Sequence, residues 1–407
     1  MKHYPKPIKL IYPNCSLCYF LALIVTLSFF HSCKNDDDPG TDELIAALNL
    51  EALPAVSNPA NNAMTQAKVA LGKSLFWDPI ISGEKDVACA TCHHPNHGYS
   101  DGLDLAIGVN GSGLGPGRTE NTGGLNLAQP IGRVPRNSPS VLNAAFNGMT
   151  SLGNYSPEYA TMFWDGRMKS LESQCQGPPT SRSEMRGDAY PEELTFDSIM
   201  GRLAAIPEYV SMFGAAFGGG AGAITTENYA KAIAAFERTI VTNNSPYDQY
   251  LRGDSEALTK QQKRGLLLFF GKANCSNCHN GPMLSDFNFH ALGVPDNPSH
   301  PDGTDDGKDH LYQFRTPTLR NATLTGPYMH NGVLSSLREV VEFENNGLSK
   351  NPHVPSGMVD LNFKPLGLTS NEIDDIVAFL ESLTDEDFDK TIPASVPSGL
   401  EVGGKIH

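Results

Sequence analysis

The sequence predicts a mainly α-helical protein with long loops, built from two similar halves. Apolar residues recur at helical spacing behind helix-capping residues, few segments alternate as strands do, and one cysteine motif occurs twice, at 89–93 and at 275–279. Gly (39) and Pro (29) are more frequent than in ordinary globular chains. The 407 residues, 40% of them hydrophobic, suffice for one large domain or two ordinary ones.

The net charge excludes one class of partner. The chain has 30 Lys and Arg residues against 45 Asp and Glu residues, which gives a formal charge of -15 at pH 7. A phosphate backbone is bound chiefly by basic side chains. The sequence therefore predicts no nucleic-acid partner.

The N-terminus has the pattern of an export signal. A basic start precedes a nearly unbroken apolar run from Leu17 to Phe30, which is short for a membrane span. The run ends near Cys33, as in bacterial lipoprotein signals, where a Cys receives lipid after cleavage. We expect 1–32 to be a lipoprotein signal peptide and 33–45 a flexible tether. The protein would then be exported, periplasmic or at the cell surface, and membrane-anchored through Cys33. A plain signal peptide and an uncleaved anchor are the alternatives.

Each repeated cysteine motif has the C-x-x-C-H form of covalent haem attachment. In that form two thiols add to the vinyl groups of haem, and the adjoining His ligates the iron. Cysteines three residues apart lie about one helical turn apart, so both can face one edge of the ring. The sequence therefore predicts two haem c groups. Their attachment residues are Cys89, Cys92 and His93, and Cys275, Cys278 and His279.

Other uses of paired cysteines fit less well. A zinc site would place its two cysteine pairs about 15 to 20 residues apart, whereas these pairs are far apart in the chain and each has its own His. Thioredoxin-like redox pairs and simple disulfides do not require that His. The remaining thiol of the mature chain, Cys175, is expected to be a small buried residue.

The motifs divide the chain into an N-terminal haem domain (46–190), a helical connector (191–244), a C-terminal haem domain (245–390) and an extended tail (391–407). A Gly- and Asn-rich stretch at 108–132 is expected to be a loop.

Helices are expected at four places in the second part of the chain. In the connector, one apolar face is formed by Leu203, Ile206, Val210 and Phe213, and a second helix covers about 226–241. Thr259 with Gln262 predicts a capped helix that ends near Gly271. Thr369 with Glu372 predicts another, whose apolar face contains Ile373, Ile376, Val377, Leu380 and Leu383.

Further segments give the chain a family resemblance. They are Arg136–Pro139, Phe163–Arg167, Gln174, Gly177–Pro178, Glu184–Met185, Thr316–Asn321 and Gly326–Gly332. With the two motifs they cover most of residues 65–385, in the order typical of bacterial dihaem cytochrome c peroxidases, a family that includes MauG. The chain resembles this family. The resemblance implies two cytochrome c-like haem domains related as an internal repeat.

The resemblance implies different roles for the two haems. The haem of His93 would be peroxidatic, and the haem of His279 would pass electrons to it. Glu184 and Gln174 match the acid–base pair that moves a proton between the peroxide oxygens; alone, Glu184 would be interpreted as a surface carboxylate. Trp164 matches the aromatic residue between the haems and would be an electron relay, a core aromatic, or both.

The same resemblance implies one calcium ion between the domains. Asn137 and the backbone carbonyls of Thr325 and Pro327 match the calcium ligands of the family, and oxygen ligands suit this cation.

The chain departs from the family at the distal face of the first haem. Some members have an iron-capping His in the loop that corresponds to 107–111, where this chain has Val109. His94 and His97 are too close to His93 in sequence to reach the opposite face easily. We therefore expect this haem to be five-coordinate or water-bound in the oxidised protein.

A second departure concerns the distal ligand of the other haem. Where family members place Met or Tyr, this chain has Glu344. An anionic oxygen ligand there would lower the reduction potential relative to Met. An open site is an alternative, and the alternative ligand residues are Met329, His330, Met283 and Met358.

The resemblance implies an enzyme that reduces hydrogen peroxide to water with electrons from a small cytochrome c or similar donor, which the acidic surface would steer if that donor is basic. A MauG-like enzyme that oxidises side chains of a partner protein through high-valent iron is the alternative, favoured by both departures. A non-catalytic electron carrier is the third interpretation, but the acid–base pair and the uncapped first haem argue against it. A homodimer is compatible with each.

Overall fold

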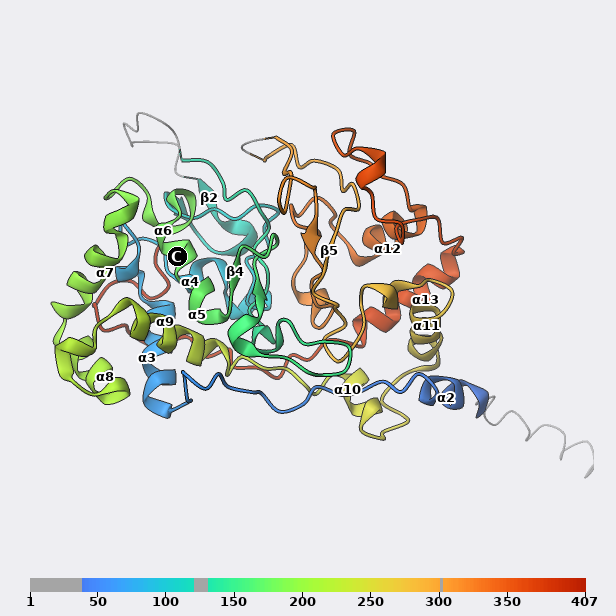
Figure 1. Ribbon diagram of the computed structural model, residues 1–407, viewed down its shortest axis with the longest axis horizontal. Coiled ribbons are helices and arrows are strands. Elements are labelled where there is room, and N and C mark those ends of the chain that lie inside the picture. The colour runs from blue at the N-terminus through green and yellow to red at the C-terminus, as the bar shows by residue number, and fades with distance from the viewer. Residues whose placement is uncertain (1–38, 121–130, 301–302) are drawn as a thin grey trace, which may run out of the picture. The chain divides into compact units, whose positions relative to one another are not determined.

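The computed structural model describes residues 39–120, 131–300 and 303–407 (Figure 1). The segment expected to be a signal peptide and the expected lipidation residue, Cys33, lie outside these residues. Residues 44–407 form one compact unit. The fold is mainly helical with little strand, as the sequence predicts.

The α-helices are α2 (Pro39–Ala46), α3 (Gln66–Trp77), α4 (Cys89–Cys92), α5 (Leu171–Gln174), α6 (Gly177–Thr180), α7 (Thr195–Ala204), α8 (Pro207–Phe217), α9 (Thr226–Glu237), α10 (Pro246–Leu251), α11 (Lys260–Phe270), α12 (Leu337–Asn346) and α13 (Ser370–Glu381). The strands pair as antiparallel ladders: β1 (Gly111–Ser112) with β2 (Thr119–Glu120), β3 (Thr161–Met162) with β4 (Met168–Lys169), and β5 (Phe289–His290) with β6 (Phe314–Arg315).

A glycine allows the closest helix packing in each half of the compact unit. A Cβ on Gly72 of α3 would lie 1.9 Å from the Ala232 carbonyl oxygen of α9. A Cβ on Gly265 of α11 would lie 1.9 Å from the Asp375 carbonyl oxygen of α13. Figure 1 shows the two helix pairs, α3 with α9 and α11 with α13. Backbones can approach this closely only where no side chain intervenes.

A hydrogen bond from a serine hydroxyl to a backbone carbonyl also occurs in both halves. The Ser100 hydroxyl donates to the Ser138 carbonyl at 2.7 Å, and the Ser285 hydroxyl donates to the Thr316 carbonyl at 2.8 Å. Both acceptors precede a proline. Five residues after each acceptor an asparagine has positive φ, 61° at Asn143 and 59° at Asn321.

The two predicted capping boxes are confirmed. Thr259 accepts from the Gln262 N–H and Thr369 from the Glu372 N–H, and each Gln or Glu side chain accepts the N–H of its cap in return. These contacts satisfy backbone donors that a helix start leaves unpaired. The apolar face of α13 is buried, with Phe379 of α13 against Phe269 of α11 at 5.2 Å between ring centroids.

The connector differs from the sequence prediction. The expected continuous apolar face is divided between α7 and α8, because Pro207 follows Ile206, whose backbone is extended (φ -106°, ψ 110°). Leu203 and Phe213 are nonetheless buried in one cluster. The second helix, α9, ends at Glu237 rather than near 241. Part of the segment expected to be a tether is helical, as α2.

The tail after Lys390 has no helix or strand and packs on the N-terminal half. The Ser398 hydroxyl donates to Asp78 at 2.6 Å, the Gly403 N–H donates to the Trp77 carbonyl at 2.7 Å, and the Thr91 hydroxyl donates to the Gly403 carbonyl at 2.7 Å. Because Thr91 lies inside the first cysteine motif, the tail supports that motif directly.

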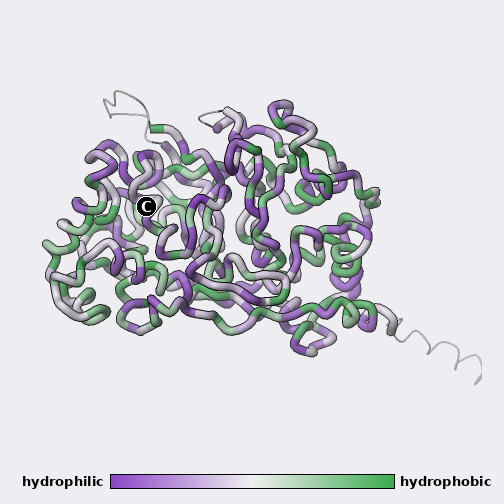
Figure 2. The backbone as a smooth tube through the Cα atoms, in the orientation of Figure 1, coloured by the Kyte–Doolittle hydropathy of each residue, from purple (hydrophilic) through white to green (hydrophobic). Residues whose placement is uncertain are grey.

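Within the described ranges, no helix is both long enough and apolar enough to cross a membrane. Hydrophobic and hydrophilic positions are interleaved along the backbone tube in Figure 2.

Candidate active site

The first cysteine motif presents an imidazole that can ligate a metal. Cys89 and Cys92 bound the short helix α4, and His93 follows it. His93 Nδ1 lies 3.2 Å from the Tyr99 carbonyl oxygen. A carbonyl only accepts, so Nδ1 carries the proton and Nε2 keeps its lone pair. Burial lowers the pKa of His93, which favours this neutral form.

The second motif repeats this arrangement. His279 Nδ1 lies 3.0 Å from the Leu284 carbonyl oxygen, so its Nε2 is also free to bind iron. Burial, the largest influence, lowers the pKa of His279 as well. A backbone acceptor that orients a ligating imidazole is a common feature of metal sites.

A cavity of about 740 Å³ opens beside the first motif. It is lined by Cys89, Cys92 and His93 together with Gln174, Glu184 and Trp164. The structure therefore brings the predicted attachment residues and the predicted acid–base pair to one cavity. A space of this size beside two thiols and a neutral imidazole fits a haem.

Glu184 is held in that cavity by a local π-helical turn, Arg182–Arg186. Such turns are rare and occur often at functional sites. Burial raises the pKa of Glu184, and this rise is opposed by Arg167 and by a hydrogen bond with Ser181. A carboxyl with a raised pKa exchanges a proton more readily near neutral pH than an exposed one does.

The loop at 107–111 packs against this turn. The Val109 N–H donates to the Ser183 carbonyl at 3.3 Å. A Cβ on Gly108 would lie 2.1 Å from the Ser183 carbonyl oxygen, so only glycine permits this approach. Val109 is buried, and neither His94 nor His97 lines the cavity.

A second cavity, of about 300 Å³, contains Cys275, Cys278 and His279 in its lining. Glu344 of α12 lines it, and burial raises the pKa of this carboxyl to about 7, with His290 opposing the rise. Of the alternative ligands, Met329 and His330 line the same cavity, whereas Met283 and Met358 do not. His330 stacks on Phe314 at 3.6 Å between ring centroids.

The two cavities share a wall. The residues that line both are Asn137, Ser138, Pro139, Ser140, Asn147, Trp164, Asp305 and Arg315. Trp164 Nε1 donates to the Asn137 carbonyl at 2.9 Å, which fixes the indole in this wall. The structure thus places Trp164 between the two cavities.

Backbone oxygens meet at the side chain of Asn137. Its amide nitrogen lies 2.9 Å from the Leu103 carbonyl oxygen and 3.4 Å from those of Asp104 and Pro327. Thr325, the third predicted calcium residue, lines the second cavity with Asn137 and Pro327.

Three comparisons with known proteins bear on this geometry. The profile described as "Di-haem cytochrome c peroxidase" matches residues 66–256. The chain is 37% identical to cytochrome-c peroxidase IdrP1 of Denitromonas iodatirespirans, over 82% of this chain and 86% of that protein. It is 36% identical to methylamine utilization protein MauG of Methylorubrum extorquens, over 83% of this chain and 84% of that protein.

The chain belongs to the di-haem cytochrome c peroxidase family. Among solved structures, a MauG-like protein associated with microbial copper homeostasis superimposes with a TM-score of 0.66 at 28% identity, covering 82% of this chain and 94% of that one. Family membership implies two haem c groups, and the two cavities each offer the cysteines and the free imidazole nitrogen to hold one.

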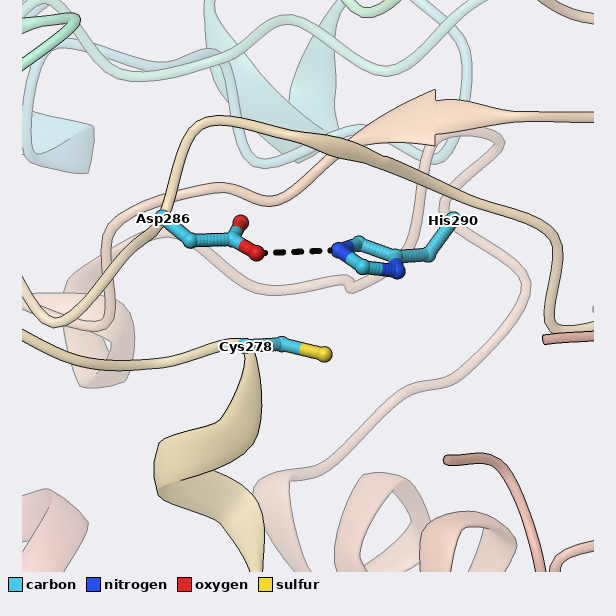
Figure 3. A group of neighbouring side chains, drawn as sticks. All are labelled: Cys278, Asp286 and His290. Atoms are coloured by element: carbon cyan, nitrogen blue, oxygen red, sulfur yellow. Dashed lines mark hydrogen bonds and ion pairs between the residues drawn. The ribbon is translucent and has the colours of Figure 1, made fainter. Parts of the chain in front are cut away.

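In this family member, one cluster of side chains combines a thiol, a carboxylate and an imidazole, which are the groups that bind metal ions. Cys278, Asp286 and His290 have ligand atoms within 4.8 Å of one another (Figure 3). His290 lies between two carboxylates, with Nε2 3.0 Å from Asp286 and Nδ1 2.6 Å from Asp360. The hydrogen bond to Asp286, the largest influence, raises the pKa of His290 above its usual range. Because Cys278 belongs to the second haem motif, we assign the cluster to the edge of that haem site.

Two further residues that line the cavities could not be identified from the sequence of this peroxidase-family chain. Glu237, at the end of α9, is 5% exposed and lines the first cavity, and its Oε2 has no hydrogen-bond partner among the described residues. Arg315 lies in the shared wall. Neither belongs to a recognisable motif, and only the convergence of distant segments places them at the site.

Proposed function

We propose that this protein is a dihaem c-type peroxidase that reduces hydrogen peroxide to water with electrons from a small cytochrome c or similar donor. One observation carries the proposal: Glu184 and Gln174 line the same cavity as His93, whose Nε2 is free to ligate iron. The names of the relatives support it, since cytochrome-c peroxidases recur among them.

The net reaction consumes one peroxide, two electrons and two protons and yields two water molecules. Bound haem supplies the iron that receives peroxide and accepts the electrons. Glu184 takes the proton of the inner peroxide oxygen and delivers it to the outer oxygen, which then leaves as water. The Gln174 amide donates a hydrogen bond to the oxygen on which charge develops.

We infer the direction of electron flow from the resemblance of the two haem motifs to those of the family. With haem bound, electrons would enter at the haem of His279 and pass to the haem of His93, and the position of Trp164 in the shared wall supports this route. Trp164 provides an aromatic ring at the crossing.

The proposal is tested by Glu184→Gln, which keeps the shape of the side chain and removes its proton exchange. We expect turnover with reduced cytochrome c to fall about 100-fold or more, as general acid–base catalysis implies, with haem content unchanged. The control is Glu193→Gln, an exposed carboxylate. Full turnover in Glu184→Gln would contradict this role.

A MauG-like activity is the second candidate, and the buried Val109 favours it. Val109 cannot ligate iron and is buried in the loop that packs on the Glu184 turn, and a MauG is among the relatives. This alternative predicts slow cytochrome c oxidation together with peroxide-dependent oxidation of a partner protein, which mass spectrometry of candidate partners detects.

We further propose that the two halves are an internal repeat of one haem domain. Two features that occur once in each half support it: the close contact of two helices at a glycine, and the hydrogen bond from a serine hydroxyl to a backbone carbonyl. The closed packing around Val109 supports a first haem that is five-coordinate or water-bound when oxidised. Purely low-spin, bis-ligated spectra would contradict that coordination.

Glu344 is proposed as the distal ligand of the second haem, supported by its position in that cavity. Glu344→Ala should then change the spectrum of the second haem and leave the first unchanged. Met329 and His330 remain the alternatives in that cavity, and an unchanged spectrum would favour them or an open site.

One calcium ion is proposed at Asn137, Thr325 and Pro327, supported by the carbonyl oxygens that meet at Asn137. Calorimetric titration with calcium, repeated on Asn137→Ala, tests it.

The remaining proposals concern location and assembly. Lipidation at Cys33, with export and membrane anchoring, is supported by the sequence of the N-terminal signal. Labelled fatty acid should enter the protein, and Cys33→Ser should abolish the labelling. A homodimer is tested by sedimentation.

A further inference from the structure

The shared wall contains a buried guanidinium with no carboxylate beside it. Arg315, in β6, is 8% exposed. Its Nε donates to the Phe163 carbonyl at 3.0 Å, and its backbone N–H donates to the Trp164 carbonyl at 2.7 Å. Within the described part of the chain, no Asp or Glu pairs with it; burial alone lowers its pKa, to about 10. At neutral pH the side chain is therefore still a cation.

The other arginines that line the cavities are all neutralised. Arg136 pairs with Asp165 and Asp305, Arg167 pairs with Asp165, and Arg320 pairs with Asp248. The contrast shows that this chain places carboxylates beside its cavity-lining arginines as a rule. Arg315 is the exception, and it is the arginine that lines both cavities.

A buried cation without a counter-ion is costly, because it loses its hydration and gains no opposite charge. A haem carries two propionate carboxylates, and a guanidinium fork matches a carboxylate through two parallel N–H···O bonds. Since both cavities are haem sites, the missing anion is available from the cofactor itself.

We propose that Arg315 binds a propionate of one of the two haems within the shared wall and so fixes that haem against the backbone of Trp164. The inference rests on the proposed function only in that both cavities must hold haem. Because the cation stabilises the more electron-rich, reduced form of the nearby haem, it raises the reduction potential of that haem.

The experiment compares three variants of the haem-loaded protein. Arg315→Met removes the charge and the donors, Arg315→Lys keeps the charge without the fork, and Arg133→Met removes an arginine that lines neither cavity. The measurements are the propionate bending band in resonance Raman spectra and the midpoint potentials of both haems, without peroxide.

We expect Arg315→Met to shift the propionate band and to lower one midpoint potential. Arg315→Lys should shift the band and largely restore the potential, and Arg133→Met should change neither. Unchanged bands and potentials in haem-loaded Arg315→Met would overturn the inference. If Arg315→Met fails to retain haem, an unshifted band in Arg315→Lys overturns it. Absence of haem from the wild-type protein would instead contradict the proposed function.

Discussion

At the scale of single residues, the site depends on which polar groups are partnered and which are not. The carbonyls that hold Nδ1 of His93 and His279 leave the opposite ring nitrogens free. Glu184 lines the cavity and has a raised pKa, whereas the half-buried Glu172 is paired with Arg238 at 2.6 Å and its pKa is lowered. Burial alone therefore does not identify a reactive carboxyl. The carboxyl must also lack a strong ion-pair partner.

Glu237 should make the stability of the protein depend on pH. Burial raises the pKa of this carboxyl from 4.5 to about 8, with Arg238 opposing and Glu172 adding to the rise. Between these values the folded state holds a proton that the unfolded state has lost, so the free energy of unfolding falls as pH rises through this window. In Glu237→Gln that loss disappears, and the variant should be more stable than the wild type at pH 8 by about 1–3 kcal/mol.

Denaturant unfolding of the haem-loaded protein at pH 5 and pH 8 measures this effect. Other buried carboxyls titrate in the same range, so the difference between variant and wild type is the relevant quantity. Glu193→Gln, at an exposed position, should leave the pH slope unchanged. Parallel slopes for Glu237→Gln and the wild type would contradict the prediction.

At the scale of elements, the close helix contacts at Gly72 and Gly265 position the helices that lead to the two cavities. α9 ends in Glu237 at the first cavity, and α11 leads into the second cysteine motif. Since each crossing brings helix backbones together, these helices can be shifted by a single added methyl group.

Gly265→Ala should destabilise the protein, because its Cβ would lie 1.9 Å from the Asp375 carbonyl oxygen. Overpacking of this kind costs about 1–3 kcal/mol. Gly201→Ala in α7 is the matched control, since a Cβ there meets nothing within 4 Å. It should stabilise the helix by about 0.5–1 kcal/mol. Chemical denaturation of both variants checks the opposite signs; equal effects would refute the packing argument.

At the scale of the whole molecule, segments distant in sequence complete the first site. The tail reaches Trp77 and Thr91, and Arg118 donates to the carbonyls of Gly108 and Lys405 at 2.7 and 3.0 Å. The end of the chain therefore supports both the first motif and the loop that packs against Glu184.

Deletion of residues 398–407 should loosen the first haem site selectively. The deletion removes the contacts of Ser398 with Asp78 and of Gly403 with Thr91 and Trp77, so we expect a melting temperature lower by several degrees and a changed spectrum of the first haem. Removal of the exposed His407 alone is the control. A truncated protein with the wild-type melting temperature and spectra would show that the tail is dispensable.

The sequence by itself predicted the family of this protein and its two haem groups. Local patterns can be interpreted from a sequence because their physical cause lies within a few residues. In this chain they are the C-x-x-C-H motifs, the capping boxes at Thr259 and Thr369, and the segment around Glu184. Pro207 is also a local signal for the end of a helix, but the helical spacing of the apolar residues on both sides of it favoured one continuous face.

Only the tertiary structure decided which groups meet. The unpartnered Oε2 of Glu237, the uncompensated Arg315 and the contact of the tail with Thr91 depend on segments far apart in the chain. Burial and pairing are properties of that convergence: a carboxylate or guanidinium has its ordinary chemistry until the fold removes water and decides whether a counter-charge replaces it.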